Sequence, residues 1–181
     1  MIDPQLREQA LSTLVQHGWS SVRPGLYLHG PSQRLMGFYG EQSVLGVWPV
    51  STGLKGFGNA QDSGQTPMGL HTLGECIGAG QPLGMCFVGR QATGQIVETT
   101  EDRSRDYITT RIIRLCGAVP GFNQGPGVDS YERYIYIHGT PHLADLGQPV
   151  SHGCVRMHSA HLLELFDQVG PGDLLYIEPG R

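Results

Sequence analysis

A cysteine and a histidine in one short segment could form a nucleophilic pair. His138 ends an apolar run, and Cys154 lies sixteen residues later in the turn-forming sequence Ser-His-Gly-Cys. A free thiol with a pKa of about 8.5 is only a few per cent thiolate at neutral pH, so a neighbouring imidazole is needed to take its proton. The strand that ends at His138 and the loop that carries Cys154 would bring the two groups together across a cleft. The segment therefore predicts a cysteine nucleophile with a histidine base.

The residues next to Cys154 have candidate roles of their own. Gly153 has no side chain, so the peptide N–H groups of Gly153 and Cys154 can approach an acyl oxygen and form an oxyanion hole. Arg156 offers a bidentate partner for a carboxylate, either that of a substrate or an internal one in a structural ion pair. His152 either contacts substrate or only caps the loop, and Ser151 is equally compatible with a purely local turn role.

A zinc site is the main rival, because five of the eight histidines fall within 24 residues that also hold Cys154. The residues between the first two are Gly-Thr-Pro, which prevents a helical i, i+4 pair, and the chain has no CxxC or HExxH motif. We therefore expect no metal and no other cofactor. The five histidines are His138, His142, His152, His158 and His161.

The elements that must position these residues are short. Gly (27 residues) and Pro (12) are abundant among the 181 residues, which favours many segments joined by turns. Short β-rich runs between such turns predict a mainly β sandwich or barrel-like fold in a single domain, residues 1–181. Residues 99–106 and 121–129 are interpreted as loops. The predicted strands are residues 26–29, 35–39, 43–50, 70–73, 85–88, 95–99, 107–116, 131–138 and 174–177.

Two helices flank this β-rich region. Asp3 is a typical N-cap and Pro4 a typical first residue of a helix, and Gly18 is a residue at which a helix commonly ends. The sequence therefore predicts a helix at about 4–17. The second helix is predicted after the cysteine, at residues 160–169, with Ser159 as a possible cap and Gly170 ending it.

Charge and cysteine use limit the partners and the location. The net charge of −4 and the absence of a basic stripe argue against a nucleic-acid partner. Every apolar run is too short for a bilayer helix, so no membrane partner is expected. Acidic residues stand where a secretory signal would be positive, which favours a cytoplasmic location. The four cysteines, Cys76, Cys86, Cys116 and Cys154, are expected to be free thiols.

The segment around Cys154 resembles a known signature. His138-Gly139-Thr140, then Gly147 and Pro149, then Ser-His-Gly-Cys-Val-Arg-Met at 151–157 are similar to the active-site motif of the L,D-transpeptidase family with the YkuD-type catalytic domain. Residues 50–53 (Val-Ser-Thr-Gly) and 66–69 (Thr-Pro-Met-Gly) match the same family in the right order, and the resemblance implies that 66–69 is framework. The resemblance covers about 44–177. It implies a mainly β domain whose cysteine attacks the carbonyl next to a D-amino acid in a peptidoglycan stem peptide.

The resemblance also implies roles for individual residues. Cys154 corresponds to the nucleophile and His138 to its general base. The carbonyl of Gly139 or the hydroxyl of Ser151 would orient the imidazole. The turn His152-Gly153-Cys154 would supply the oxyanion site, and Arg156 would shape it. A binding module without activity is the remaining alternative, although such a module has no use for a base beside a thiol.

Two outcomes of the same thioester are open. Water would make the protein an L,D-carboxypeptidase that trims tetrapeptides to tripeptides, and an amine would make it a crosslinking L,D-transpeptidase. The expected cytoplasmic location favours the carboxypeptidase, acting on stem peptides or muropeptides during recycling. Residues 76–106 and 121–129 would narrow the cleft to one peptide. Arginines would hold the carboxylates of that peptide, the candidates being Arg103, Arg105, Arg111 and Arg114.

Overall fold

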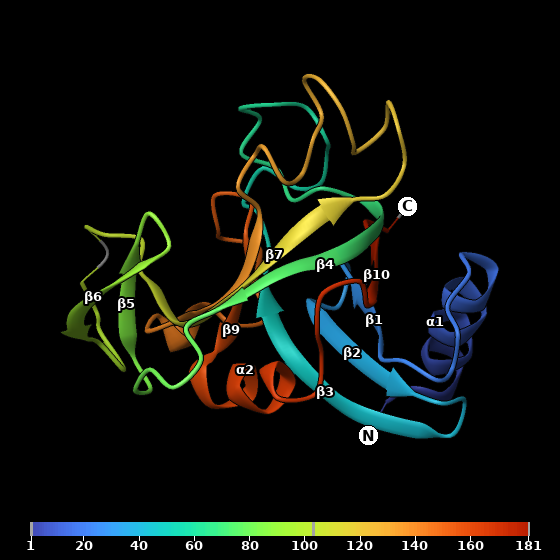
Figure 1. Cartoon of the computed structure of the whole chain (residues 1–181), viewed down its shortest axis with the longest axis horizontal. Helices are drawn as coiled ribbons and strands as arrows, with labels where there is room; N and C mark the ends of the chain where they lie inside the picture. Colours follow the sequence, from blue (N-terminus) through green and yellow to red (C-terminus); the bar gives the residue numbers. More distant parts are fainter. Residues whose placement is uncertain (1, 103, 181) are drawn as a thin grey trace.

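A computed structural model describes residues 2–102 and 104–180, and within them the chain forms ten strands, two α-helices and one short 3-10 helix (Figure 1). No helix of this part is long and apolar enough to cross a membrane. The elements are α1 (Pro4–Gln16), β1 (Gly25–His29), β2 (Arg34–Tyr39), β3 (Ser43–Ser51), β4 (Gly69–Ile77), β5 (Met85–Val88), β6 (Gln91–Ile96), β7 (Ile108–Gly117), β8 (Tyr136–Thr140), η1 (Leu143–Asp145), β9 (Val155–His158), α2 (Ser159–Phe166) and β10 (Leu174–Glu178).

The strands close into a barrel. Their order is β4-β10-β1-β2-β3-β9-β8-β7-β5-β6, and an additional pairing of β4 with β7 joins the two ends of the run from β4 to β7. The β5–β6 hairpin extends from β7 outside this ring (Figure 1). Closure pairs the backbone groups that an open edge would leave exposed. The predicted mainly β, barrel-like fold with two helices is therefore confirmed.

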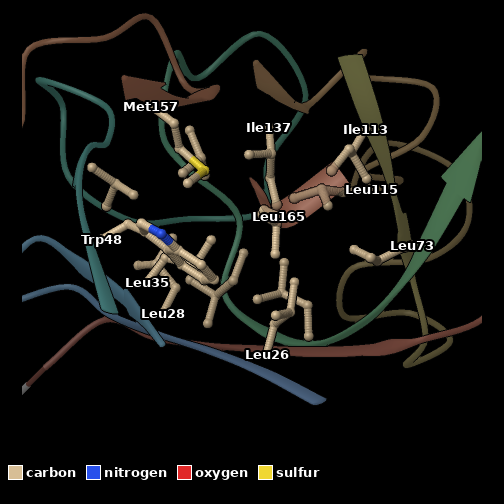
Figure 2. Packing of buried hydrophobic residues seen from close by; sticks show 14 of the residues in the cluster. Leu26, Leu28, Leu35, Trp48, Leu73, Ile113, Leu115, Ile137, Met157 and Leu165 are labelled. Carbon is tan, nitrogen blue, oxygen red and sulfur yellow. The ribbon is translucent and has the colours of Figure 1, made fainter. Parts of the chain in front are cut away.

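The main hydrophobic core fills the inside of the barrel (Figure 2). Alternate residues of each strand point inward, as the two-residue period of a strand requires. Leu162 and Leu165 of α2 join the same cluster, so this helix packs on the barrel. The inward side chains nearest the predicted site are Ile113, Ile137, Val155 and Met157, all fully buried. Their even-numbered neighbours on β7, β8 and β9 must therefore point outward.

Helix α1 covers a second, smaller core. The Asp3 carboxylate accepts a hydrogen bond from the Gln5 N–H at 3.0 Å, and Pro4 occupies the first turn. This is the capping that the sequence predicts, and the helix ends at Gln16, one residue before the expected limit. Ala10 and Leu14 are fully buried against the outer side of the barrel.

The β6 strand lies earlier in the chain than the predicted strand at 95–99. Gly89 and Arg90 make a two-residue turn, so Val88 pairs directly with Gln91 and β6 starts there. The exposed residues of β6 have no apolar alternation, which is why the sequence pattern missed them.

The predicted strand at 131–138 is wrong in its first half. Residues 131–134 form a turn in which Asp129 accepts hydrogen bonds from the N–H groups of Tyr131 (2.9 Å) and Gly125 (2.8 Å). This local capping outweighs the β propensity of the tyrosines. β8 therefore begins only at Tyr136.

The predicted helix at 160–169 is also shorter than expected. His158, and not Ser159, is its N-cap, because the His158 Nδ1 accepts from the Ala160 N–H at 3.2 Å. The helix ends at Phe166. The other predicted strands form close to the predicted bounds, except that β4 runs four residues further, to Ile77.

Candidate active site

Cys154 and His138 lie on adjacent parallel strands. Ile137 pairs with Val155 and His138 with Arg156 in the β8–β9 register, and Cys154 directly precedes β9. Paired residues of neighbouring strands point to the same side of a sheet, and so do residues two apart on one strand. Because Ile137 and Val155 point into the barrel, His138 and Cys154 share its outer face. The structure thus brings the two predicted residues together on one surface.

The imidazole of His138 is held in one orientation. Its side chain is almost fully buried, and Nδ1 donates a hydrogen bond to the carbonyl of Gly139 at 2.9 Å. A carbonyl only accepts, so the proton is on Nδ1 and the lone pair is on Nε2. Burial lowers the pKa of His138, and the bond to Gly139 opposes this only in part. The ring is therefore neutral at physiological pH and can accept a proton at Nε2.

The thiol of Cys154 is in contact with two backbone groups of the segment that leads into β8. Sγ accepts from the Tyr136 N–H at 3.4 Å and donates to the Tyr134 carbonyl at 3.5 Å. Burial raises the pKa of Cys154 to about 11, against the opposing effects of the Tyr136 N–H and two nearby arginines. The pair is therefore neutral thiol and neutral imidazole. Among the described residues no hydrogen bond joins the two, so the thiol must leave the Tyr134 carbonyl before it transfers its proton.

The turn that carries Cys154 is organised by Ser151. The Ser151 hydroxyl donates to the Cys154 carbonyl at 2.6 Å and accepts from the Gly153 N–H at 3.1 Å. Of the two groups expected to orient His138, the Gly139 carbonyl makes the contact, and Ser151 instead shapes the turn. The Gly153 N–H is already engaged, which leaves the Cys154 N–H as the predicted oxyanion donor without a hydrogen bond in the described part of the chain.

The segment that contains Thr66 fixes the same turn from behind. The buried Thr66 hydroxyl donates to the Gly153 carbonyl and accepts from the Gly53 N–H, both at 2.8 Å. Gly153 has φ of +126°, and a Cβ there would lie 3.1 Å from the Gln65 carbonyl, so a side chain would be strained and crowded. Thr66 thus acts as framework, as the family resemblance of residues 66–69 implied.

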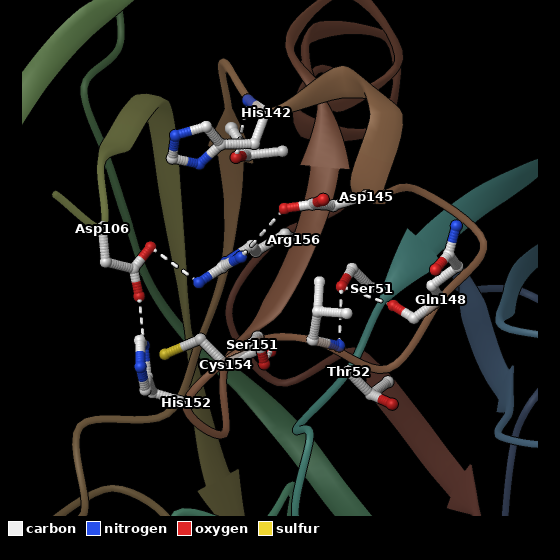
Figure 3. A network of polar contacts seen from close by, with 12 residues as sticks. Ser51, Thr52, Asp106, His142, Asp145, Gln148, Ser151, His152, Cys154 and Arg156 are labelled. Carbon is white, nitrogen blue, oxygen red and sulfur yellow. Dashed lines mark hydrogen bonds and ion pairs between the residues drawn. The ribbon is translucent and has the colours of Figure 1, made fainter. Parts of the chain in front are cut away.

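Asp106 joins His152 and Arg156 at the rim of the site (Figure 3). One carboxylate oxygen contacts the exposed His152 Nδ1 at 2.8 Å, and the other contacts the buried Arg156 Nη2 at 2.9 Å. Arg156 also approaches Asp145 at 3.8 Å. Arg156 was expected to bind either a substrate carboxylate or an internal one, and the structure shows the internal ion pair. His152 was expected either to contact substrate or to cap the loop, and the structure shows a hydrogen bond to Asp106 that holds the loop.

The carboxylate of Asp106 is ionised in this network. Burial alone would raise the pKa of Asp106, but the hydrogen bond from His152 and the charge of Arg156 outweigh it and hold the pKa below its usual value. Asp106 lies in the exposed loop predicted at residues 99–106, with its side chain 36% exposed, and it adds the two contacts to His152 and Arg156. No sequence pattern pointed to this residue.

A small polar cavity lies next to this network. Its volume is about 140 Å³. Two of its lining residues, His152 and Arg156, flank Cys154 in the chain, and Figure 3 shows Sγ pointing toward the Asp106 side. The residues that line it are Arg105, Asp106, His142, Asp145, Val150, His152 and Arg156.

This geometry can be compared with known proteins. Residues 25–177 match the family model of the YkuD-type L,D-transpeptidase catalytic domain. The chain belongs to the L,D-transpeptidase family. No curated protein sequence matches it.

Solved L,D-transpeptidase structures share the fold. One from Mycobacterium smegmatis is 17% identical with a TM-score of 0.52 over 86% of this chain and 58% of the other. One from Xylanimonas cellulosilytica is 16% identical with a TM-score of 0.54 over 98% and 71%. One from Stackebrandtia nassauensis is 14% identical with a TM-score of 0.50 over 88% and 57%. The chain therefore covers less than two thirds of the length of two of these three L,D-transpeptidases.

Of the four arginines predicted to hold substrate carboxylates, the three that the structure describes have different surroundings in this L,D-transpeptidase fold. Arg111 turns toward α2, where its guanidinium lies 5.4 Å from the Phe166 ring centroid. Arg105 lines the small cavity, and Arg114 stacks on Tyr131. Arg103 lies outside the described residues. No sequence pattern pointed to Arg133, whose charge opposes the raised pKa of Cys154 and whose Nη2 donates to the Gln65 carbonyl at 2.6 Å.

The histidines that suggested zinc are spread apart. His142 Nε2 donates to the Asp102 carbonyl at 2.9 Å, and His158 and His161 pack against each other at the start of α2. In residues 2–102 and 104–180 no group of three or more His, Cys, Asp or Glu side chains is arranged to hold a metal ion.

Proposed function

We propose that this protein is a cysteine L,D-carboxypeptidase that removes the terminal D-alanine from peptidoglycan tetrapeptides in the cytoplasm. One observation carries the proposal. The Cys154 thiol and the His138 imidazole share the outer face of adjacent strands, with Nδ1 anchored to Gly139 so that Nε2 is free to accept a proton. Membership of the L,D-transpeptidase family supplies the substrate class, stem peptides or muropeptides.

The reaction uses the residues in two halves. His138 Nε2 takes the Cys154 proton as Sγ attacks the carbonyl carbon before D-alanine, and the Cys154 N–H donates to the developing oxyanion. The protonated imidazole then gives its proton to the leaving amine, which releases D-alanine and leaves a thioester. In the second half His138 takes a proton from water, the hydroxide attacks the thioester, and the tripeptide leaves while the thiol is restored.

The small polar cavity is compatible with hydrolysis. Its lining includes His152 and Arg156, which flank Cys154 in the chain, and its volume of about 140 Å³ would hold one small terminal residue or water. The four free cysteines are compatible with a reducing compartment. The alternative is an L,D-transpeptidase, which the family model and the names of the structural neighbours favour.

The products decide between the two. Purified protein is incubated with disaccharide tetrapeptide, with and without an added acceptor peptide, and the products are identified by mass. We expect disaccharide tripeptide and free D-alanine in equal amounts, and none from Cys154→Ala. A crosslinked dimer as the main product would overturn the carboxypeptidase in favour of the transpeptidase. Unchanged tetrapeptide would overturn both. Fractionation of producing cells against a cytoplasmic marker tests the location.

A further inference from the structure

A cluster of arginine and tyrosine side chains lies next to Cys154. Arg90 Nη1 donates to the Tyr136 hydroxyl at 3.1 Å, and the Arg90 guanidinium lies 5.2 Å from the Tyr134 ring centroid. Arg114 stacks at 3.4 Å on Tyr131 and donates to its carbonyl. We call these five residues the Arg90–Tyr134 patch: Arg90, Arg114, Tyr131, Tyr134 and Tyr136.

The patch is joined to the nucleophile by its own backbone. The Tyr136 N–H donates to Sγ of Cys154, and the Tyr134 carbonyl accepts from the same thiol. These are the two tyrosines whose side chains contact Arg90. A group bound by Arg90 therefore lies one tyrosine side chain away from the reacting sulfur.

Two residues of the patch have unfavourable backbones. Arg90 has φ of +70° and Tyr134 has φ of +56°, in the left-handed region that bulky residues rarely adopt. The two-residue turn between β5 and β6 requires this φ of Arg90, whereas Tyr134 adopts it in an irregular turn. Here the two strained residues contact each other, which places the Arg90 guanidinium over the segment that contacts Cys154.

The patch has more positive than negative charge, although the chain as a whole carries −4. Glu75 is its acidic neighbour, and it contacts Arg114 at 3.8 Å and the Tyr131 hydroxyl at 2.8 Å. Among the described residues Arg90 has no ion-pair partner, and the buried Nε of Arg114 has no hydrogen-bond partner. The arrangement therefore offers a forked donor, backed by a second fixed cation, to a carboxylate from outside.

We infer that the Arg90–Tyr134 patch binds a substrate carboxylate on the N-terminal side of the bond that is cleaved, and that Arg90 sets this specificity. The inference builds on the proposed function. The carboxylate of the leaving D-alanine is only three covalent bonds from the attacked carbon, too near to reach across the Tyr136 side chain. A carboxylate on the residue that precedes the attacked one fits the separation. The preferred substrate is thus an acidic peptide, and its amidated form is the poorer one.

Binding and turnover are measured for two tetrapeptides that differ only in that group, a free carboxylate in one and a carboxamide in the other. Titration of Cys154→Ala protein gives Kd, and the active protein gives kcat/KM. Arg90→Gln should lower the acid-to-amide preference about fivefold or more in both measurements. Arg90→Lys should retain part of it, because the charge remains but the fork is lost. Arg34→Gln, an exposed arginine on β2, is the matched control and should keep the wild-type preference.

The outcomes separate this inference from the proposed function. An Arg90→Gln protein that loses affinity equally for both peptides, or for neither, would show that Arg90 only holds the β5–β6 hairpin, and would overturn the inference. If the wild type binds the acidic peptide through Arg90 but releases no D-alanine, the inference stands and the proposed carboxypeptidase fails. If D-alanine is released with no acid preference, the inference fails alone.

Discussion

The ionisation of Cys154 can be tested by its reaction with an alkylating agent at different pH values. With a pKa of about 11, the thiolate fraction at pH 7 is about 10⁻⁴, whereas a free cysteine with a pKa of about 8.5 has about 3%. Alkylation at pH 7 should therefore be about 300-fold slower than for a free thiol of equal nucleophilicity and access. Its rate should rise about tenfold per pH unit between pH 7 and 10.

The assay is iodoacetamide labelling at a series of pH values, followed by peptide mass analysis. Mapping separates Cys154 from Cys76, Cys86 and Cys116, whose pKa values burial also raises. His138→Gln is the informative variant. In a neutral pair the imidazole does not hold the thiolate, so this variant should keep the labelling profile of the wild type while turnover is lost.

The opposite pattern would refute the reasoning. A thiolate–imidazolium ion pair gives a plateau of reactivity between about pH 5 and 8, and that plateau would disappear in His138→Gln. Such a result would mean that the positive charge of a protonated His138 stabilises the Cys154 thiolate by more than burial opposes it. The step in which the thiol leaves the Tyr134 carbonyl would then not be needed for activation.

Three further outcomes are expected. His138→Ala should lower the rate of D-alanine release by about 10² to 10⁴, and Cys154→Ser by more, with near-normal turnover contradicting either role. Asp106→Asn should shift Cys154 labelling to lower pH, because this carboxylate raises the pKa of Cys154, so an unchanged profile would contradict the network. Burial lowers the pKa of His71 to about 4, so as pH falls below about 6.5 the unfolded chain takes up the proton first. In urea denaturation His71 alone should account for about 2 kcal/mol of the stability lost between pH 8 and pH 5, so His71→Gln should lose about that much less, and an equal loss would contradict this role.

The local elements were largely predictable because their signals are local. Asp3 and Pro4 start α1 through a cap that the sequence states directly, and Gly and Pro separate the strands. The predicted strands at 95–99 and 131–138 were wrong because a turn decides where strand pairing begins. Near β6 the turn is the one at Arg90, which has a positive φ, and before β8 it is the turn held by the Asp129 side chain. The pattern of apolar residues does not reveal either turn.

The sequence identified the reactive residues of the candidate site but not the charged residues that surround them. His138, Gly139 and Cys154 lie in one segment, so spacing and family resemblance find them together. Asp106 and Arg90 reach the site from elements that precede β7 and have no motif of their own. Their place depends on which strands pair, and the parallel pairing of β8 with β9 is a long-range contact that no short window contains.

Barrel packing and the placement of the reactive groups follow from the same strand period. Ile137 and Val155 point inward to the core, so Tyr136, His138, Cys154 and Arg156 point outward as one set. A shift of β9 by one residue against β8 would bury Cys154 and expose Val155. The core residues that alternate with the reactive ones therefore keep the thiol, the imidazole and the guanidinium on one surface. The hydrogen bonds of Thr66 and Ser151 to the Gly153 and Cys154 carbonyls then fix the backbone that carries the thiol.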